Sequence, residues 1–121
     1  MAESHNLGHK GEDEASEFLK RAGYRILFRN WKWGRNEIDL IAENREFIVF
    51  VEVKIRTKNY GLKDEDLVPR QKQRSIINAA NGYLQRYHIR KEGRFDVIII
   101  YRDNDSYEIN HIPGAYYPTL R

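Results

Sequence analysis

The chain of 121 residues contains no cysteine. Disulfide frameworks, thiol catalysis and cysteine-based zinc sites are therefore excluded, and we expect a cytoplasmic protein. No stretch approaches the roughly 18 to 20 consecutive apolar residues of a membrane span. The first ten residues also lack the apolar core of a signal peptide. We therefore expect no membrane association.

The chain also has little excess charge. Its 21 lysines and arginines outnumber its 18 acidic residues only slightly, for a net charge of +3. An interaction with nucleic acid must then be argued from where the charges lie. The length and the 40% hydrophobic content predict one globular domain over residues 1–121, with a core at about 6–112 and a surface tail at 113–121.

Hydrophobic periodicity predicts a helix first and a strand after it. Apolar and small residues recur at helical spacing from Asn6 to Ala22, and Gly23 suits the end of that helix. The segment Thr57 to Asp66 is polar and aperiodic, which predicts a loop. The remaining expected elements are strands over 24–33, 37–42, 47–56, 94–101 and 107–112, and a second helix from Pro69 to about Tyr87.

Charges interrupt the second and third expected strands. Alternation places Glu37 and Asp39 on one face, and Glu52 and Lys54 on one face of the following strand. A hairpin closed at Asn44-Arg45, or across the four residues 43–46, sets Phe50 opposite Asp39 and Glu52 opposite Glu37. All four charges then meet on one side of the sheet.

Carboxylates gathered this way repel one another and are costly to bury without a partner. A hard divalent cation such as Mg²⁺ would remove the conflict, because it takes one or two carboxylates and keeps several waters. A structural salt bridge from Lys54 to Glu52 or Asp39 would also remove it. The spacing alone leaves both interpretations open.

The order helix, three strands, helix, two strands predicts an α/β fold. A mixed sheet with one helix on each side satisfies the rules for packing layers. The nearly continuous apolar run of 94–101 indicates a strand covered on both faces, reached through the second helix by a parallel crossover.

These elements and residues resemble the PD-(D/E)xK, or restriction endonuclease-like, superfamily. Within it the chain is similar to the YraN-like family of small bacterial proteins, close in form to archaeal Holliday junction resolvases. The family usually has glycine before Glu37, and here it is Asn36, which tolerates tight turns. The matching residues are Gly8, Gly11, Glu12, Ala15, Gly23-Tyr24, Asn30-Trp31, Glu37 to Ile41, Phe50 to Lys54, Arg56, Gly61, Lys72-Gln73, Arg94 and Asp96-Val97.

The resemblance implies a metal-dependent nuclease that hydrolyses DNA phosphodiester bonds, with branched or single-stranded repair or recombination intermediates as candidate substrates. It implies that Asp39 and Glu52, with the backbone carbonyl of Val53, bind Mg²⁺ or Mn²⁺, and that Lys54 assists catalysis. The alternative on the same fold is a binding module that recruits nucleic acid or protein without cutting.

Two further acidic residues have open roles. Glu12 could reach the metal as a ligand or outer-shell base, or it could be an acid favoured by the helix dipole at the N-terminal end of the first helix. Glu37 could complete the acidic cluster or form a salt bridge with Lys54 or Arg56.

Basic and polar side chains are expected around the same corner, where cations would contact phosphates without reading sequence. Trp31 and Trp33 could stack on unpaired bases or belong to the core. The pair Tyr116-Tyr117 in the tail is a candidate contact for a homodimer or another protein. The expected nucleic-acid-binding residues are Lys32, Arg35, Arg56, Lys58, Arg70, Lys72, Gln73 and Arg74.

Overall fold

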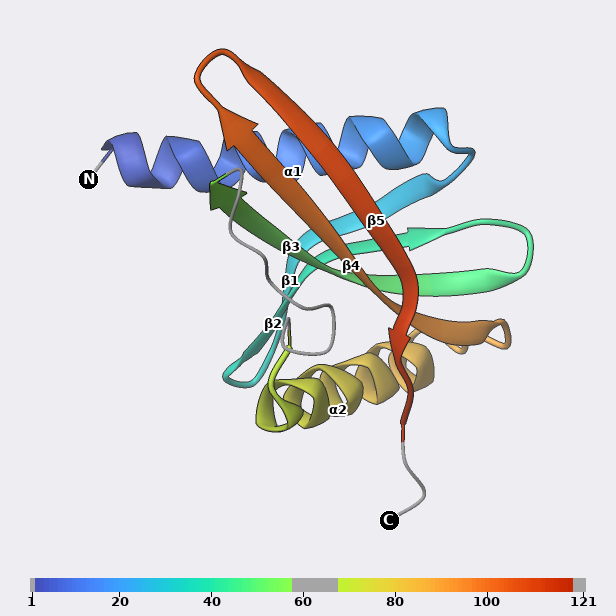
Figure 1. The fold of residues 1–121 in the computed structure, drawn as a ribbon. Coiled ribbons are helices and arrows are strands. Elements are labelled where there is room, and N and C mark those ends of the chain that lie inside the picture. The colour runs from blue at the N-terminus through green and yellow to red at the C-terminus, as the bar shows by residue number, and fades with distance from the viewer. Residues whose placement is uncertain (1, 58–67, 119–121) are drawn as a thin grey trace.

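The computed structural model describes residues 2–57 and 68–118, with side chains described from residue 11 onward. The predicted order of helices and strands is confirmed (Figure 1). The predicted loop began at Thr57, which instead ends the third strand, and the rest of that loop, 58–66, lies outside the described residues. The elements are α1 (Ala2–Arg21), β1 (Arg25–Trp33), β2 (Asn36–Glu43), β3 (Phe47–Thr57), α2 (Arg70–Arg86), β4 (Glu92–Asp103) and β5 (Ser106–Tyr116).

The five strands form one mixed sheet in the order β1-β2-β3-β4-β5. Neighbouring strands are antiparallel except β3 and β4, which pair in parallel over eleven residue pairs. The chain passes from β3 to β4 through α2, as the sequence predicted. This mixed α/β arrangement is consistent with a restriction endonuclease-like fold.

Each helix covers a different face of the sheet (Figure 1). Leu19 of α1 packs with Val49 and Val51 of β3, whereas Ile76 and Tyr83 of α2 pack on the opposite face. The third strand alternates as predicted, because even-numbered residues such as Phe50 face α2 and odd-numbered residues face α1. Both sides of β3 and β4 are therefore buried.

The first helix begins at Ala2, four residues before the predicted start. Its end is as predicted, because Gly23 adopts φ +95° and the Tyr24 amide donates to the Leu19 carbonyl. Glu12 consequently lies in the middle of α1. The helix dipole acts within the terminal turn, so the dipole explanation for Glu12 is wrong.

The hairpin between β2 and β3 turns one residue later than predicted. The Asn44 side-chain oxygen accepts from the amides of Glu46 (2.9 Å) and Phe47 (2.8 Å), which places Arg45 and Glu46 at the tip. The strands then pair as Ile41 with Phe50 and Leu40 with Val51. The predicted register, with Phe50 opposite Asp39, is wrong by two residues.

The ladder between β2 and β3 stops at the pair Leu40 and Val51. Beyond this rung β2 stays paired with β1, while β3 continues along β4, so the two strands diverge (Figure 1). Asp39 and Glu52 are the first residues past the last rung on their strands. We call this divergence the fork.

The C-terminal segment departs from the predicted surface tail. Strand β5 runs to Tyr116, whose ring is buried and stacks on Phe95 at 5.3 Å between centroids. Tyr117 is exposed, with 63% of its surface accessible. The periodicity of the last strand is disturbed at Gly114, where φ is +59° and the register shifts, and this irregularity hid the continuation.

A buried carboxylate occupies that irregularity. Asp96 of β4 accepts from the Gly114 amide at 3.0 Å, from Arg94 Nε and Nη2 at 2.9 and 2.8 Å, and lies 2.7 Å from His111 Nε2. Arg94 is thus the ion-pair partner of Asp96. His111, which carried no sequence signal, is part of this group, and Asp96 has a structural role away from the fork.

No helix in the described part of the chain is both long and apolar enough to cross a lipid bilayer.

Candidate metal and phosphodiester site

Asp39 lies at the fork because the β1–β2 hairpin is kinked there. Asn30 of β1 falls opposite Asp39, between the pairs Arg29 with Leu40 and Trp31 with Ile38, and it adopts φ +53°. Asn is one of the few residues that enter this left-handed region readily. The Asp39 carboxylate is thus turned to the neighbouring strand, where its Oδ2 accepts from the Val53 amide at 2.9 Å.

The surroundings of Asp39 favour its protonated form. Burial and the negative charge of Glu52 raise the pKa of Asp39 to about 7, against an opposing contribution from the Val53 hydrogen bond. Glu12 raises this pKa further and Lys72 lowers it. Four ionisable groups from four different elements therefore act on one another at the fork.

Glu52 is almost fully buried, and two lysines share one of its oxygens. Lys72 Nζ donates to Glu52 Oε1 at 2.7 Å, and Lys54 Nζ lies 3.5 Å from the same oxygen. The salt bridge predicted between Lys54 and Glu52 is therefore present. The shorter contact comes from α2, twenty residues away along the chain.

Glu12 is held by the kink in β1. Asn30 Nδ2 donates to Glu12 Oε1 at 2.9 Å, and Arg29 Nη2 lies 3.6 Å from the same oxygen. Sequence reasoning did not select Asn30 as a site residue. Its left-handed conformation depends on the pairing of β1 with β2, and its contact with Glu12 depends on the packing of α1 on the sheet. Neither is visible in the pattern of residues along the chain. Asn30 thus positions the Glu12 carboxylate on the α1 side of the fork.

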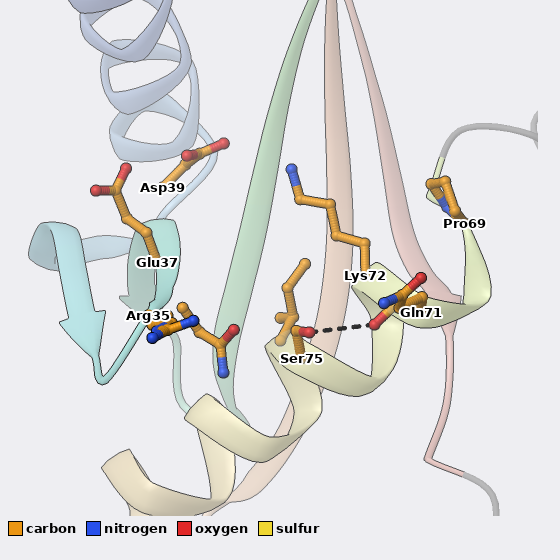
Figure 2. Close-up of a pocket in the computed structure, with 9 residues that line it drawn as sticks. Arg35, Glu37, Asp39, Pro69, Gln71, Lys72 and Ser75 are labelled. Atoms are coloured by element: carbon orange, nitrogen blue, oxygen red, sulfur yellow. Dashed lines mark hydrogen bonds between the residues drawn. The ribbon is translucent and has the colours of Figure 1, made fainter.

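The fork opens into a cleft of about 500 Å³ between the β1–β2 turn and α2. Figure 2 shows Asp39 and Glu37 on the hairpin side and Lys72 reaching from the helix side. Among the described residues Glu37 pairs with neither Lys54 nor Arg56. The cleft is lined by Arg35, Asn36, Glu37, Asp39, Pro69, Gln71, Lys72, Ser75 and Ile76.

The structure divides the predicted nucleic-acid-binding residues into separate groups. Arg35 and Lys72 line the cleft with Asp39. Arg70, Gln73 and Arg74 instead line a smaller hollow of about 150 Å³ with Tyr117, on another side of α2. The prediction that all of them surround one corner is therefore wrong, because successive residues of a helix point in different directions.

Two of the predicted residues also donate hydrogen bonds to backbone carbonyls. Gln73 Nε2 donates to the Val68 carbonyl at 2.8 Å, at the start of α2, and Arg56 Nη1 donates to the Ile55 carbonyl at 2.9 Å. Lys32 is exposed on β1. Lys58 lies outside the residues that the structure describes.

The two tryptophans belong to the core between β1 and α2. Trp31 is buried and stacks on Trp33 at 5.6 Å between ring centroids. Trp31 also meets the Tyr83 ring edge-on at 5.3 Å. Neither tryptophan is free to stack on bases, so of the two interpretations the core role is confirmed.

The donor set at the fork fits a hard divalent cation. It offers the carboxylates of Asp39 and Glu52, and the pKa of Asp39 is raised by burial and by the negative charge of Glu52. A bound cation would relieve this repulsion. Mg²⁺ needs only one or two protein carboxylates. Among the side chains described at residues 11–57 and 68–118, no three acidic or histidine groups converge as a ready-made cage, so waters would complete the coordination.

Comparison with known proteins then identifies the family. Residues 11–100 match the family described as "Uncharacterised protein family UPF0102". The chain is 36% identical to a UPF0102 protein of Parabacteroides distasonis over 121 residues, all of both chains. It is 37% identical to one of Phocaeicola vulgatus over 120 residues, 99% of each.

The chain belongs to the UPF0102 family. The predicted YraN-like membership is confirmed, and with it the placement in the restriction endonuclease-like superfamily. A UPF0102 protein of Syntrophotalea carbinolica is 39% identical over 112 residues, 92% of this chain and 91% of that protein. The matched residues contain the whole fork, from Glu12 through Asp39 and Glu52 to Lys72, and end before β5.

Proposed function

We propose that this UPF0102 protein is a metal-dependent nuclease that hydrolyses DNA phosphodiester bonds at the fork. The observation that carries the proposal is the meeting of Asp39 and Glu52 just past the last β2–β3 rung, with Lys54 3.5 Å from Glu52. The adjacent cleft is large enough to admit part of a nucleic-acid strand.

Asp39 and Glu52 would hold Mg²⁺ or Mn²⁺, with the Val53 carbonyl as a predicted further ligand. A bound divalent cation supplies polarisation of the phosphate and a lowered pKa for a coordinated water. Lys54 is fixed beside Glu52 on β3, where its ammonium can neutralise charge that develops on the phosphate. Glu12, held by Asn30, lies on the other side and can accept a proton from water through the outer shell.

The cleft suits a flexible strand better than an undistorted duplex. Its volume of about 500 Å³ is of the size of a small-molecule pocket, and the carboxylates of Glu37 and Asp39 are among the groups that line it. A single-stranded or branched DNA can bend a phosphate into such a space. Arg35 at the hairpin turn would contact the backbone without reading sequence.

The test is cleavage of flapped, four-way and single-stranded DNA with Mg²⁺ or Mn²⁺ by the wild type, Glu52→Gln and Lys54→Met. We expect cleavage by the wild type and a loss of about 10²-fold or more in each variant, comparable with the removal of one electrostatic catalytic group. Asp103→Asn, on the exposed end of β4, is the matched control. Cleavage that survives both site substitutions would contradict the proposal.

A second candidate is a binding module that recruits nucleic acid or protein without hydrolysis. One observation favours it: Glu52 already has its charge satisfied by Lys72 and Lys54. This candidate predicts binding of the same DNA panel with no dependence on metal and no cleavage. Retained DNA binding by Glu52→Gln in the absence of any wild-type cleavage would favour it.

A further inference from the structure

Two lysines contact Glu52, which is one more positive charge than a single carboxylate needs for neutralisation. Its Oε1 accepts from Lys72 at 2.7 Å and lies 3.5 Å from Lys54. A divalent cation bound by the same carboxylate would add two more positive charges within a few ångströms. Like charges at that separation repel strongly in a partly buried site. One of the two lysines must therefore move if a cation binds.

The two lysines differ in their freedom to move. Lys54 lies on the central strand β3 and only 16% of its side chain is exposed. Lys72 comes from the first turn of α2, has 47% of its side chain exposed and borders the cleft. A lysine ammonium on a four-carbon stem reorients easily. Lys72 is thus the side chain that can leave without disturbing the sheet.

A displaced Lys72 ammonium would lie in the cleft that the side chain already borders. The side chain reaches from the helix toward Asp39 and Glu37 across the cleft (Figure 2). Arg35 lines the opposite side of the same space. An ammonium released there would meet the phosphate of any strand that enters the cleft, and lysine binds phosphate as a point charge.

Resting on the proposed function, we propose that Lys72 is a built-in counter-ion that a divalent metal displaces from Glu52, after which its ammonium binds the substrate phosphate. Without metal, Lys72 neutralises the Glu52 carboxylate. With metal, the same side chain becomes part of the phosphate-binding surface. Metal binding and phosphate binding are then coupled through one lysine.

The first experiment measures Mn²⁺ affinity by titration calorimetry at fixed pH and salt for the wild type, Lys72→Met and Arg86→Met. Arg86 lies in the last turn of the same helix, so its variant controls for a lost positive charge. We expect Lys72→Met to bind Mn²⁺ about 10- to 150-fold more tightly, the factor that corresponds to losing a competing charge-assisted hydrogen bond. Arg86→Met should match the wild type.

The second experiment needs no destabilising variant. Lysines of the wild-type protein are dimethylated with ¹³C-formaldehyde, which keeps their charge, and their methyl resonances are followed by NMR during Mg²⁺ titration. The Lys72 resonance is assigned by its absence in Lys72→Arg. Before metal is added, we expect the chemical shift of the Lys72 methyl resonance to differ from those of the exposed lysines. On metal binding it should move to the chemical shift of the exposed lysines.

The outcomes separate this inference from the proposed function. If the wild type binds neither Mn²⁺ nor Mg²⁺, the metal site is wrong and the displacement is wrong with it. If the wild type binds metal while Lys72→Met binds equally or less tightly, or the Lys72 resonance stays in place at saturation, only the displacement is wrong. Should Lys72→Met fail to fold, the resonance of the wild type decides.

Discussion

The ionised side chain of Asp39 destabilises the folded protein. Its pKa is about 7 in the folded chain, whereas the ordinary value is 3.8, so the folded state binds more protons than the unfolded state between these two pH values. The stability that this group contributes is complete below about pH 4 and is lost as the pH rises through 7. At neutral pH and above, the fork is therefore under electrostatic strain without metal.

Replacing Asp39 with asparagine should remove that strain. Asparagine keeps an oxygen that can accept from Val53 and carries no charge. We expect the free energy of unfolding of Asp39→Asn to exceed that of the wild type by about 1 to 3 kcal/mol at pH 8. This is part of the full effect of the pKa shift, which is roughly 1.4 kcal/mol per pKa unit. At pH 4.5 the two proteins should be nearly equally stable. Urea unfolding at both pH values measures this. Equal stability at pH 8 would contradict it.

Asp96 shows the opposite balance. Burial alone would raise the pKa of Asp96, but hydrogen bonds from His111, Arg94 and the Gly114 amide prevail and hold the pKa below its usual value. The resulting stability is present above the ordinary pKa of 3.8 and is lost as the pH falls through the lower folded value. The carboxylate therefore stabilises the protein at neutral pH.

Asp96→Asn should lower the free energy of unfolding at pH 7 by about 2 to 4 kcal/mol, because Arg94 is left buried without its counter-ion. Urea denaturation at pH 7 is the measurement, with Asp105→Asn in the exposed turn before β5 as the matched control. The difference should shrink as the pH is lowered below 4. A loss no larger than that of the control would show that the pair contributes nothing net.

At the scale of elements, α2 is held close to the β1–β2 hairpin by a glycine. A Cβ at Gly82 would lie 2.5 Å from a ring carbon of Trp33, inside the contact limit of any side chain. The Trp33 ring is itself stacked on Trp31. The hairpin arm and the helix that bound the cleft are thus joined at a contact that only glycine permits.

Gly82→Ala should consequently destabilise the protein, although alanine is the better helix former. The helix gains about 0.5 to 1 kcal/mol from alanine, whereas overpacking against a ring costs about 1 to 3 kcal/mol. We expect a net loss of about 1 to 2 kcal/mol in urea unfolding, with changed tryptophan fluorescence. Gly11→Ala is the comparison, since its closest neighbour is the flexible end of Ile55 and a smaller loss is expected. A stabilised Gly82→Ala would refute the argument.

The order of elements could be predicted from sequence because period-2 and helical patterns survive in β3, α2 and β4. The register of the β2–β3 hairpin could not. It depends on the Asn44 side chain accepting from the Glu46 and Phe47 amides, one of several turns that the same residues permit. The end of β5 was missed for a similar reason, since a bulge filled by Asp96 interrupts its alternation.

At the scale of the whole molecule, the candidate site combines residues from α1, β1, β2, β3 and α2. Asp39, Glu52 and Lys54 could be selected from sequence because charges stand out in apolar strands. The contact of Lys72 with Glu52 and that of Asn30 with Glu12 depend on how both helices pack. Such long-range contacts leave no local pattern, so the set of interacting groups became visible only in three dimensions.

Metal binding at the proposed site should be linked to pH. Asp39 must lose its proton to act as a ligand, and its pKa of about 7 places that loss in the neutral range. We expect Mn²⁺ to raise the melting temperature more at pH 8 than at pH 6. Calorimetry in buffers of different ionisation enthalpy should detect close to one proton released at pH 6 and almost none at pH 8.5. Binding independent of pH would rule out Asp39 as a ligand.

The hydrogen bond from the Val53 amide to Asp39 gives the protein a spectroscopic reporter at its own fork. An amide proton that points at a carboxylate is deshielded, and it loses that deshielding when the carboxylate takes up a proton or gives its charge to a cation. The ¹H shift of Val53 should therefore titrate upfield as the pH falls through 7, and respond again to Mg²⁺. One resonance, on backbone that needs no mutation, would record both the protonation and the occupancy of the site.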